Sequence, residues 1–132
     1  SVQLERIAEG ARSDGGPQIE LEVLAEHAPA NVANCFAAIL REALSNTIRH
    51  ARAQNVTVRC MEHPSFYQLI VTDDGTGATK TNSRGIAEGM GLGSMRERVE
   101  ALGGTFTAGP RAGAPGWRVF ATVPKQQGDD AR

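Results

Sequence analysis

Residues 42–51 read EALSNTIRHA, and they close a stretch in which apolar side chains recur at spacings of three and four. This periodicity predicts an amphipathic helix over residues 32–52, with Asn31 or Asn34 as its N-cap. The predicted core-facing stripe consists of Phe36, Leu40, Ala43, Leu44, Thr47, Ile48 and Ala51. The helix is therefore expected to bury one face and to leave another free for polar groups.

That second face carries a regular set of polar side chains. Glu42, Asn46 and His50 are four residues apart, and Arg49 lies beside them in the chain. At about 100° per residue they share one face, away from the apolar stripe. Carboxylate and amide oxygens suit Mg²⁺, which usually binds one or two protein oxygens together with substrate phosphates, and an arginine can contact a phosphate oxygen. The alternative is an ordinary solvated helix face.

A short acidic and glycine-rich segment, residues 73–77, reads DDGTG and directly follows the alternating strand pattern of residues 67–71. A carboxylate at a strand end, here Asp73, can accept a hydrogen bond from an exocyclic amine. The two glycines would let a planar base lie against the backbone. The alternative is a simple Asp-Gly turn.

A second glycine-rich segment, residues 89–93, reads GMGLG and directly precedes a helical pattern marked by Leu92, Met95, Val99 and Leu102. A helix N-terminus with free N–H groups favours anions, so the segment is a candidate phosphate cradle. It is not the dinucleotide-binding fingerprint, because Ser94 follows it, and it is not a P-loop, because no Gly-Lys-Ser/Thr follows. The alternative is a flexible linker before a helix. Residues 78–90 are small and polar and predict a mobile loop.

Taken together and in this order, the three segments resemble the ATP-binding catalytic domain of bacterial two-component sensor histidine kinases. Its wider fold is shared with gyrase B, Hsp90 and MutL. Residues 42–51 are similar to the N box, residues 73–77 to the first G box and residues 89–98 to the second. The resemblance covers about residues 18–124.

One subgroup of these kinases is especially similar. The run MRERV at residues 95–99, followed by Gly103 and Gly104, resembles kinases with a short ATP lid, typified by nitrate and oxygen or redox sensors. Residues 78–88 contain no Phe, so the aromatic F box of the longer-lid kinases is absent.

The resemblance implies a Bergerat fold, an α+β arrangement or α/β sandwich whose mixed, mostly antiparallel sheet is covered by helices on one face. The sequence patterns agree with it, since the elements follow the order β-α-β-β-loop-α-β-β. Strands are expected near residues 19–24, 56–61, 67–71, 105–107 and 117–123. The chain then divides into an N-terminal lead-in (1–17, short helical or irregular), the ATP-binding domain (18–124) and a C-terminal tail (125–132).

The resemblance also implies roles for single residues. Asn46 would ligate Mg²⁺, and Glu42 would lie just outside the metal's ligands or orient a water molecule; these two are the candidate catalytic residues. Asp73 would accept a hydrogen bond from the adenine amino group. Gly75 and Gly77 would let the base and ribose lie close to the backbone.

The phosphate side of the site is implied in the same way. Arg49 and His50 would line it, and the start of the second helix would hold the phosphates through Gly89, Met90, Gly91 and Leu92. Lys80 or Arg84 in the loop could also reach the phosphates, and the spacing does not decide between them.

The implied activity is that of an ATP-dependent protein-histidine kinase. The domain would bind Mg-ATP and donate the γ-phosphoryl group to a histidine on a separate dimerisation domain, for onward transfer to a response regulator. None of the three histidines fits the acceptor, because His27 precedes Ala28-Pro29, His63 precedes Pro64 and His50 belongs to the N box. The chain, as a monomeric fragment, is expected to bind ATP without phosphorylating itself.

Two other functions remain open. An anti-sigma-factor serine kinase has the same fold, although the short lid and the MRER run argue against it. A non-catalytic nucleotide-sensing module is the second alternative, and the three intact motifs argue against that one.

The charge and composition of the chain limit the kinds of partner that it is expected to have. The formal net charge is −1 over 132 residues, which disfavours a protein that tracks nucleic acid. No run of 18 apolar residues occurs, and the first residues do not open a signal peptide. Cys35 and Cys60 have no metal-site spacing with the histidines and are expected to be reduced thiols. The segment is therefore expected to be cytoplasmic, without membrane or nucleic-acid contact, whether the full-length protein is soluble or membrane-anchored.

Overall fold

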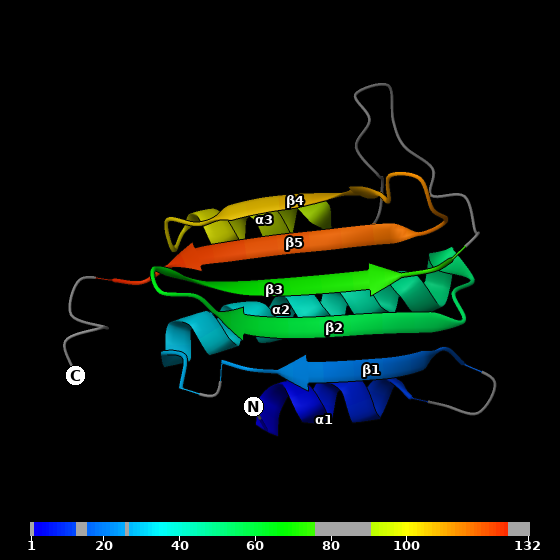
Figure 1. The fold of residues 1–132 in the computed structure, drawn as a ribbon, viewed down its shortest axis with the longest axis horizontal. Helices are drawn as coiled ribbons and strands as arrows, with labels where there is room; N and C mark the ends of the chain where they lie inside the picture. The colour runs from blue at the N-terminus through cyan, green and yellow to red at the C-terminus, as the bar shows by residue number, and fades with distance from the viewer. Residues whose placement is uncertain (1, 13–15, 26, 76–90, 127–132) are drawn as a thin grey trace.

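The computed structural model describes residues 2–12, 16–25, 27–75 and 91–126. These residues form one sheet and a layer of helices (Figure 1). The elements are α1 (Val2–Ala11), β1 (Gln18–Val23), α2 (Ala30–Asn46), the π-helical turn η1 (Thr47–Ala51), β2 (Asn55–Glu62), β3 (Phe66–Asp73), α3 (Leu92–Glu100), β4 (Thr105–Pro110) and β5 (Trp117–Pro124).

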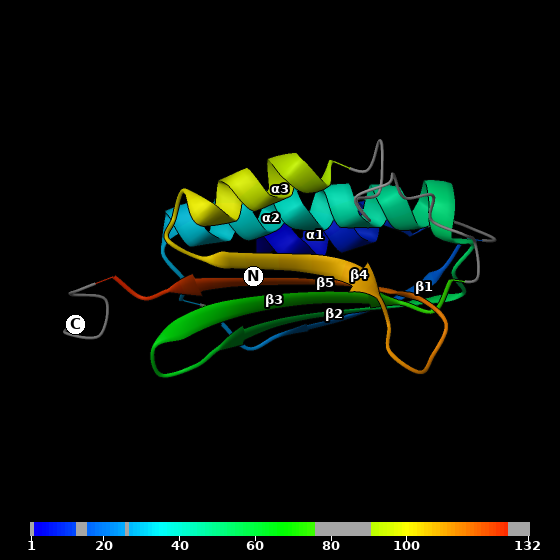
Figure 2. The same ribbon diagram turned by 90° about the horizontal axis from the view of Figure 1, so that it is seen from above.

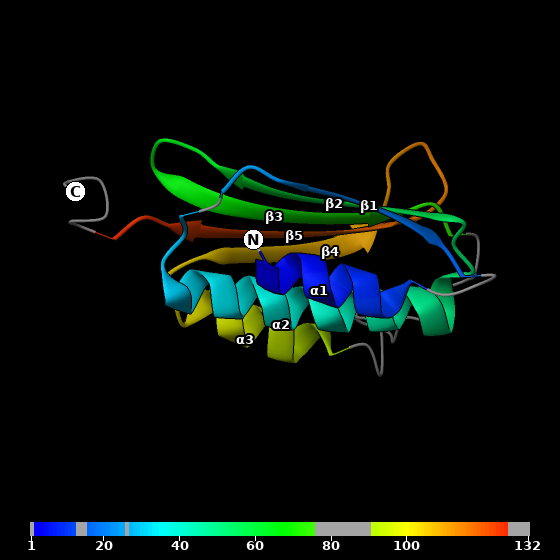
Figure 3. The same ribbon diagram turned by 90° about the horizontal axis from the view of Figure 1, so that it is seen from below.

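The five strands lie in the order β1-β2-β3-β5-β4. β1 runs parallel to β2, and every other neighbouring pair is antiparallel. The expected mixed, mostly antiparallel sheet is thus confirmed. Figures 2 and 3 show α1, α2 and α3 on the same face of the sheet, with α2 between the other two.

Alternation along the strands decides which side chains face the helices. In β3 the buried residues are Tyr67, Leu69, Val71 and Asp73. Successive side chains of a strand point to opposite faces, so Asp73 continues the inward-facing apolar series. The last residue of β3 therefore presents its carboxylate to the helix layer rather than to solvent.

The central helix α2 follows its predicted stripe for most of its length. Phe36, Leu40, Ala43, Leu44 and Thr47 are buried as predicted. Ile48 is 52% exposed, so its place in the stripe was wrong. The chain enters the π turn η1 at Thr47, where i→i+5 bonding widens the turn, and the spacing of three and four no longer returns a side chain to the same face.

The start of α2 also differs from the prediction. Neither Asn31 nor Asn34 is the N-cap, because the helix begins at Ala30 and Pro29 precedes it. The Pro29 carbonyl accepts the first helical bond from the Ala33 amide at 2.9 Å. The fixed φ of proline, here −57°, already suits a helix start, so no side-chain cap is needed.

Two further elements complete the helix layer. α1 buries Leu4 and Ala8 against the common core, so the lead-in is helical. α3 buries Met95 and Val99 as its pattern predicted. The amide of Gly104 donates to the Val99 carbonyl at 3.0 Å, and this bond closes the C-terminal end of the helix. The predicted mobile loop, residues 78–90, and tail residues 127–132 lie outside the described residues.

Candidate functional site

The chemistry-bearing segments of the sequence meet where the second half of α2, the end of β3 and the start of α3 come together. Asp73 is the most enclosed polar group there, with 5% of its surface exposed. Its Oδ1 accepts a hydrogen bond from the Gly75 amide at 2.8 Å, and its Oδ2 accepts one from Thr47 Oγ1 at 3.3 Å. The segment after β3 and the turn after α2 thus each donate one hydrogen bond to the Asp73 carboxylate.

Burial raises the pKa of Asp73 above its usual value of 3.8. Hydrogen bonds from the Gly75 backbone, the Thr47 hydroxyl and the Trp117 backbone act in the opposite direction, and the nearby Asp74 adds a small upward push. Desolvation is the largest effect, so the direction is upward. A buried carboxylate of this kind is suited to accept a hydrogen bond from a ligand that enters and shields it.

Thr47 was expected only to fill the core, yet it makes two polar contacts. Its hydroxyl lies 3.0 Å from the Ala43 carbonyl oxygen and 3.3 Å from Asp73 Oδ2. A hydroxyl has a single proton, so it can donate fully to only one of these acceptors at a time. Oδ2 therefore keeps acceptor capacity. The sequence signal was available, because a Thr in a buried helical stripe needs a partner for its hydroxyl.

Asp74 has a different role from its neighbour. Its Oδ1 accepts hydrogen bonds from the backbone amides of Gln54 and Asn55, both at 2.9 Å, and its Oδ2 accepts one from Asn55 Nδ2 at 2.9 Å. The bonds from Asn55 are the main reason that the pKa of Asp74 is lowered. Asp74 ties the end of β3 to the start of β2 and leaves Asp73 as the inward-facing acid.

The N box and the second G box touch through Glu42 and Gly91. Gly91 precedes α3 with a left-handed φ of 68°, which glycine adopts without strain. A Cβ at Gly91 would lie 2.9 Å from the carboxyl carbon of Glu42, so the Glu42 side chain rests directly on this glycine's backbone. Two segments that are about fifty positions apart in the chain therefore form one wall.

Asn46 lies one turn after Glu42 and is 5% exposed. Arg49 donates from Nη2 to the Asn46 side-chain oxygen at 3.4 Å and from Nε to the Ser45 carbonyl at 3.4 Å. The amide oxygen of Asn46 and the carboxylate of Glu42 are both hard donors, so this pair fits Mg²⁺ better than a thiophilic metal. Among the described residues, no group of three or more His, Cys, Asp or Glu side chains could hold a metal without a ligand's help.

Three pairs of predicted site residues are in contact in the structure: Glu42 with Gly91, Arg49 with Asn46, and Asp73 with Gly75. Leu92 is the first residue of α3. The side chain of His50, and all of Gly77, Lys80, Arg84, Gly89 and Met90, lie outside the described residues. Sequence reasoning missed Gly116, whose φ is 122°; a Cβ there would lie 2.9 Å from the Asp73 carbonyl carbon. The Pro-Gly pair before the last strand was the signal for it.

Comparison with known families and proteins agrees with this geometry. Residues 31–127 match the family model described as histidine kinase-, DNA gyrase B-, and HSP90-like ATPase. Within the described residues, no helix combines the length and apolar character that crossing a bilayer requires.

Curated relatives are named as sensor kinases. The chain is 35% identical over 88 residues to the signal transduction histidine-protein kinase/phosphatase UhpB of Salmonella typhimurium, covering 67% of this chain and 16% of that protein. It is 44% identical over 77 residues to the sensor histidine kinase NarS of Mycobacterium tuberculosis, and the match covers 55% of this chain and 18% of that protein. It is 33% identical over 96 residues to the nitrate/nitrite sensor protein NarQ of Escherichia coli, and the match covers 71% of this chain and 16% of that protein. The chain thus spans only a small part of each of these relatives.

Solved structures show the same fold. The blue-light activated histidine kinase of Erythrobacter litoralis EL346 superposes with a TM-score of 0.75 at 21% identity, over 96% of this chain and 42% of that one. The Acinetobacter baumannii histidine kinase AdeS superposes with a TM-score of 0.71 at 15% identity, over 93% of this chain and 63% of that one. At these identities the likeness concerns the fold.

Proposed function

Because this chain belongs to the family of histidine kinase-, DNA gyrase B- and HSP90-like ATPases, we propose that its residues 18–124 bind Mg-ATP and serve as the phosphoryl-donating part of a sensor histidine kinase. The domain is homologous to the catalytic ATP-binding domains of sensor histidine kinases. The observation that carries the proposal is the buried Asp73 carboxylate, which accepts hydrogen bonds from Thr47 and Gly75.

Asp73 is proposed to recognise the adenine. The bond that its Oδ2 accepts from the shared Thr47 hydroxyl is long, at 3.3 Å, so an amino group of a base can supply a shorter one. Gly75 is buried beside it and has no side chain to keep a flat ring away from the backbone. Gly77 is proposed to act in the same way.

The phosphate end is proposed to lie along α2 toward the start of α3. Asn46 would hold Mg²⁺ together with phosphate oxygens, Glu42 would orient a water molecule beside it, and the ion would neutralise charge on the triphosphate. Arg49, which now donates to the Asn46 oxygen, has a guanidinium that can turn to a phosphate oxygen instead. The proposed set of phosphate-lining residues is completed by His50, Gly89, Met90, Gly91 and Leu92.

In the proposed reaction a histidine nitrogen of a separate dimerisation domain attacks the γ-phosphorus. A P–N bond forms, the bond between the γ-phosphorus and the β,γ-bridging oxygen breaks, and ADP leaves with that oxygen. The phosphoryl group then passes to a response regulator. The proposal places this domain in the cytoplasm, where ATP and the regulator are found. The relatives named above favour this role over a serine kinase and over a non-catalytic module.

Isothermal titration tests the proposal. Wild-type protein should release or absorb heat on titration with ATP and Mg²⁺, and GTP should bind at least about tenfold more weakly because its base lacks the amino group at that position. Asn46→Ala should remove most of the dependence of ATP affinity on Mg²⁺. Incubation with γ-labelled ATP should leave the isolated chain unlabelled. A wild-type protein that binds no ATP, or an Asn46 variant with unchanged Mg²⁺ dependence, would contradict the proposal.

A further inference from the structure

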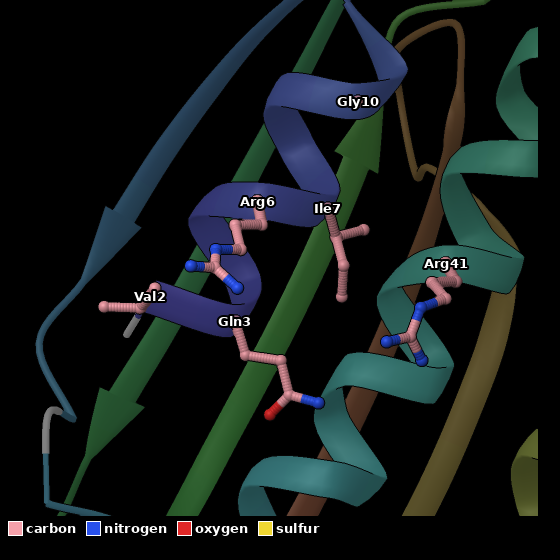
Figure 4. A pocket seen from close by; sticks show the side chains of 6 residues that line it. All are labelled: Val2, Gln3, Arg6, Ile7, Gly10 and Arg41. Atoms are coloured by element: carbon pink, nitrogen blue, oxygen red, sulfur yellow. The ribbon is translucent and has the colours of Figure 1, made fainter.

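A groove lies between α1 and α2, on the side of α2 away from α3. Its volume is about 680 Å³, and its lining consists of Val2, Gln3, Arg6, Ile7, Gly10 and Arg41 (Figure 4). Since Glu42 rests on Gly91 at the start of α3, the nucleotide-site residues use the opposite flank of α2 (Figures 2 and 3). The groove is therefore separate from the site described above.

The floor of the groove is apolar and open. α1 buries Leu4 and Ala8 in the core, which leaves Ile7 half-buried between α1 and α2, and Val2 64% exposed at the outer edge of the groove (Figure 4). Gly10 contributes no side chain, and a Cβ added there would meet nothing within 4 Å. The end of the groove near Gly10 is thus free to receive a side chain from another molecule.

The rim of the groove is positively charged. In Figure 4, the guanidinium groups of Arg6 from α1 and Arg41 from α2 lie on either side of Ile7. No carboxylate lines the groove, and within the described parts of the chain neither arginine forms an ion pair. Of the acids close by in the sequence, Glu9 pairs with Arg12 at 2.7 Å and Glu42 rests on Gly91, whereas Glu5, which precedes Arg6, lines a neighbouring hollow and not this groove.

We propose that this groove is a docking site for an acidic amphipathic helix of a partner domain. The helix would place carboxylates against Arg6 and Arg41 and an apolar side chain on Val2 and Ile7. Arginine suits this role because its planar fork binds a carboxylate through two parallel hydrogen bonds. In helix-in-groove complexes, an amphipathic helix lays its apolar face into an apolar groove, and the groove between α1 and α2 could receive a helix in this way.

Two other occupants fit the groove less well. A second copy of this chain, related by a two-fold axis, would bring Arg6 and Arg41 against the same two positive charges, which opposes association. A free phosphate would satisfy the guanidinium groups but would leave Val2 and Ile7 uncovered. The partner helix is the occupant that matches both the charge and the apolar floor.

The test uses a fluorescein-labelled amphipathic peptide of leucine, alanine and glutamate, with a version in which every Glu is replaced by Gln. Fluorescence anisotropy should show binding of the Glu peptide to the wild-type chain and about tenfold weaker binding of the Gln peptide. Arg6→Glu and Arg41→Glu should each weaken the Glu peptide about tenfold. Arg118→Glu is the matched control, because it makes the same charge change on the helix-free face of the sheet, and it should have little effect.

A charge exchange adds a second readout. A Lys version of the peptide should bind the Arg6→Glu/Arg41→Glu double variant better than it binds wild type, and the amide resonances of Ile7 and Gly10 should shift in wild type when the Glu peptide is added. ATP affinity of the double variant should be unchanged, which shows that it is folded and keeps this proposal separate from nucleotide binding. Equal losses in Arg118→Glu, absence of peptide binding, displacement of the peptide by an equal concentration of inorganic phosphate, or self-association that Arg6→Glu abolishes would overturn the docking site.

Discussion

At the scale of single residues, two adjacent carboxylates have opposite surroundings. The pKa of Asp73 is raised, mainly by burial, whereas that of Asp74 is lowered, mainly by the hydrogen bonds that it accepts from Asn55. The pleat of β3 accounts for this difference, because neighbouring side chains leave the strand on opposite sides. One acid is therefore available to a ligand while the other fastens two strand ends together.

Exchanging each acid for its amide separates these roles. Asp73→Asn should abolish measurable ATP binding while the free energy of unfolding at neutral pH stays the same or rises by about 1 kcal/mol, since the folded state no longer carries a buried charge. Asp74→Asn should retain ATP binding and lower the free energy of unfolding by about 1 kcal/mol, because bonds from Asn55 and Gln54 are weakened. Urea denaturation and calorimetric titration of both variants measure these effects. Loss of the fold in Asp73→Asn would instead indicate a structural role.

The pH dependence of the two acids follows from their pKa directions. Asp73 must be ionised to accept a hydrogen bond from the adenine, so ATP affinity should fall as pH drops through its raised pKa. Asp74 has a lowered pKa and stabilises the fold above about pH 4, the range of an unfolded Asp, and that contribution should disappear as pH falls further.

Substitution of Thr47 tests the role proposed for Asp73 without changing the carboxylate itself. Thr47→Val keeps the side-chain shape but removes the donor to Oδ2, so the pKa of Asp73 should rise further. The acid limb of ATP binding should then move to higher pH, while Thr47→Ser should behave like wild type. Carbon-detected NMR titration of the Asp73 carboxyl group reports the pKa directly. An unchanged titration in Thr47→Val would show that the hydroxyl bonds only to the Ala43 carbonyl.

At the scale of elements, the approach of α3 to α2 depends on Gly91. Its φ of 68° and the Glu42 side chain beside it both exclude a Cβ. The π turn at the end of α2 is a second local feature, since it turns Ile48 to solvent and Thr47 toward Asp73. The site is thus made at three element ends, where regular backbone gives way to irregular backbone.

A pair of glycine substitutions tests the α2–α3 wall. Gly91→Ala should lower the free energy of unfolding by about 1–2 kcal/mol, because a left-handed conformation disfavours alanine, and displacement of Glu42 should also weaken ATP binding. Gly93→Ala is the control within α3, where a Cβ meets nothing within 4 Å. It should raise stability by up to about 1 kcal/mol through helix propensity. Thermal unfolding of the two variants checks the prediction, which fails if both substitutions act in the same direction.

At the scale of the whole molecule, α1, α2 and α3 cover one face of the sheet in the described part of the chain. α1 is part of this layer, because its buried side chains join the same apolar cluster as α2 and the strands. Figure 2 shows α1 and α3 on opposite flanks of α2, so the groove lined by α1 and α2 lies on the other flank from the contact of Glu42 with Gly91 in the proposed nucleotide site. A partner in the groove and a nucleotide in the site can therefore be tested independently.

Truncation of one α1 side chain measures how much this helix contributes. Leu4 is 3% exposed, so Leu4→Ala should lower the free energy of unfolding by about 2–4 kcal/mol through lost burial and a cavity. Val2→Ala removes an exposed side chain of the same helix and should change stability by less than about 0.5 kcal/mol. Urea denaturation distinguishes the two. Equal, small effects would mean that α1 packs too loosely to count as part of the domain.

The sequence by itself determined the elements and the family. Local periodicities predicted α2, α3 and the alternating strands, and the order of the three motifs indicated the nucleotide-binding fold, because both signals are carried by neighbours in the chain. They also indicated Glu42, Asn46 and Asp73 as one constellation. The predicted N-cap of α2 was wrong because Pro29 precedes the helix, and the predicted burial of Ile48 was wrong because the π turn changes the helical spacing.

Only the tertiary structure decided how those residues meet. The contact of Thr47 with Asp73, that of Glu42 with Gly91 and the lining of the α1–α2 groove all involve residues of different elements. No periodicity of one segment contains such contacts, because they depend on how the helices pack on the sheet. The same packing buries Asp73 and raises its pKa, so the chemistry of the site is a property of the folded layers rather than of any single motif.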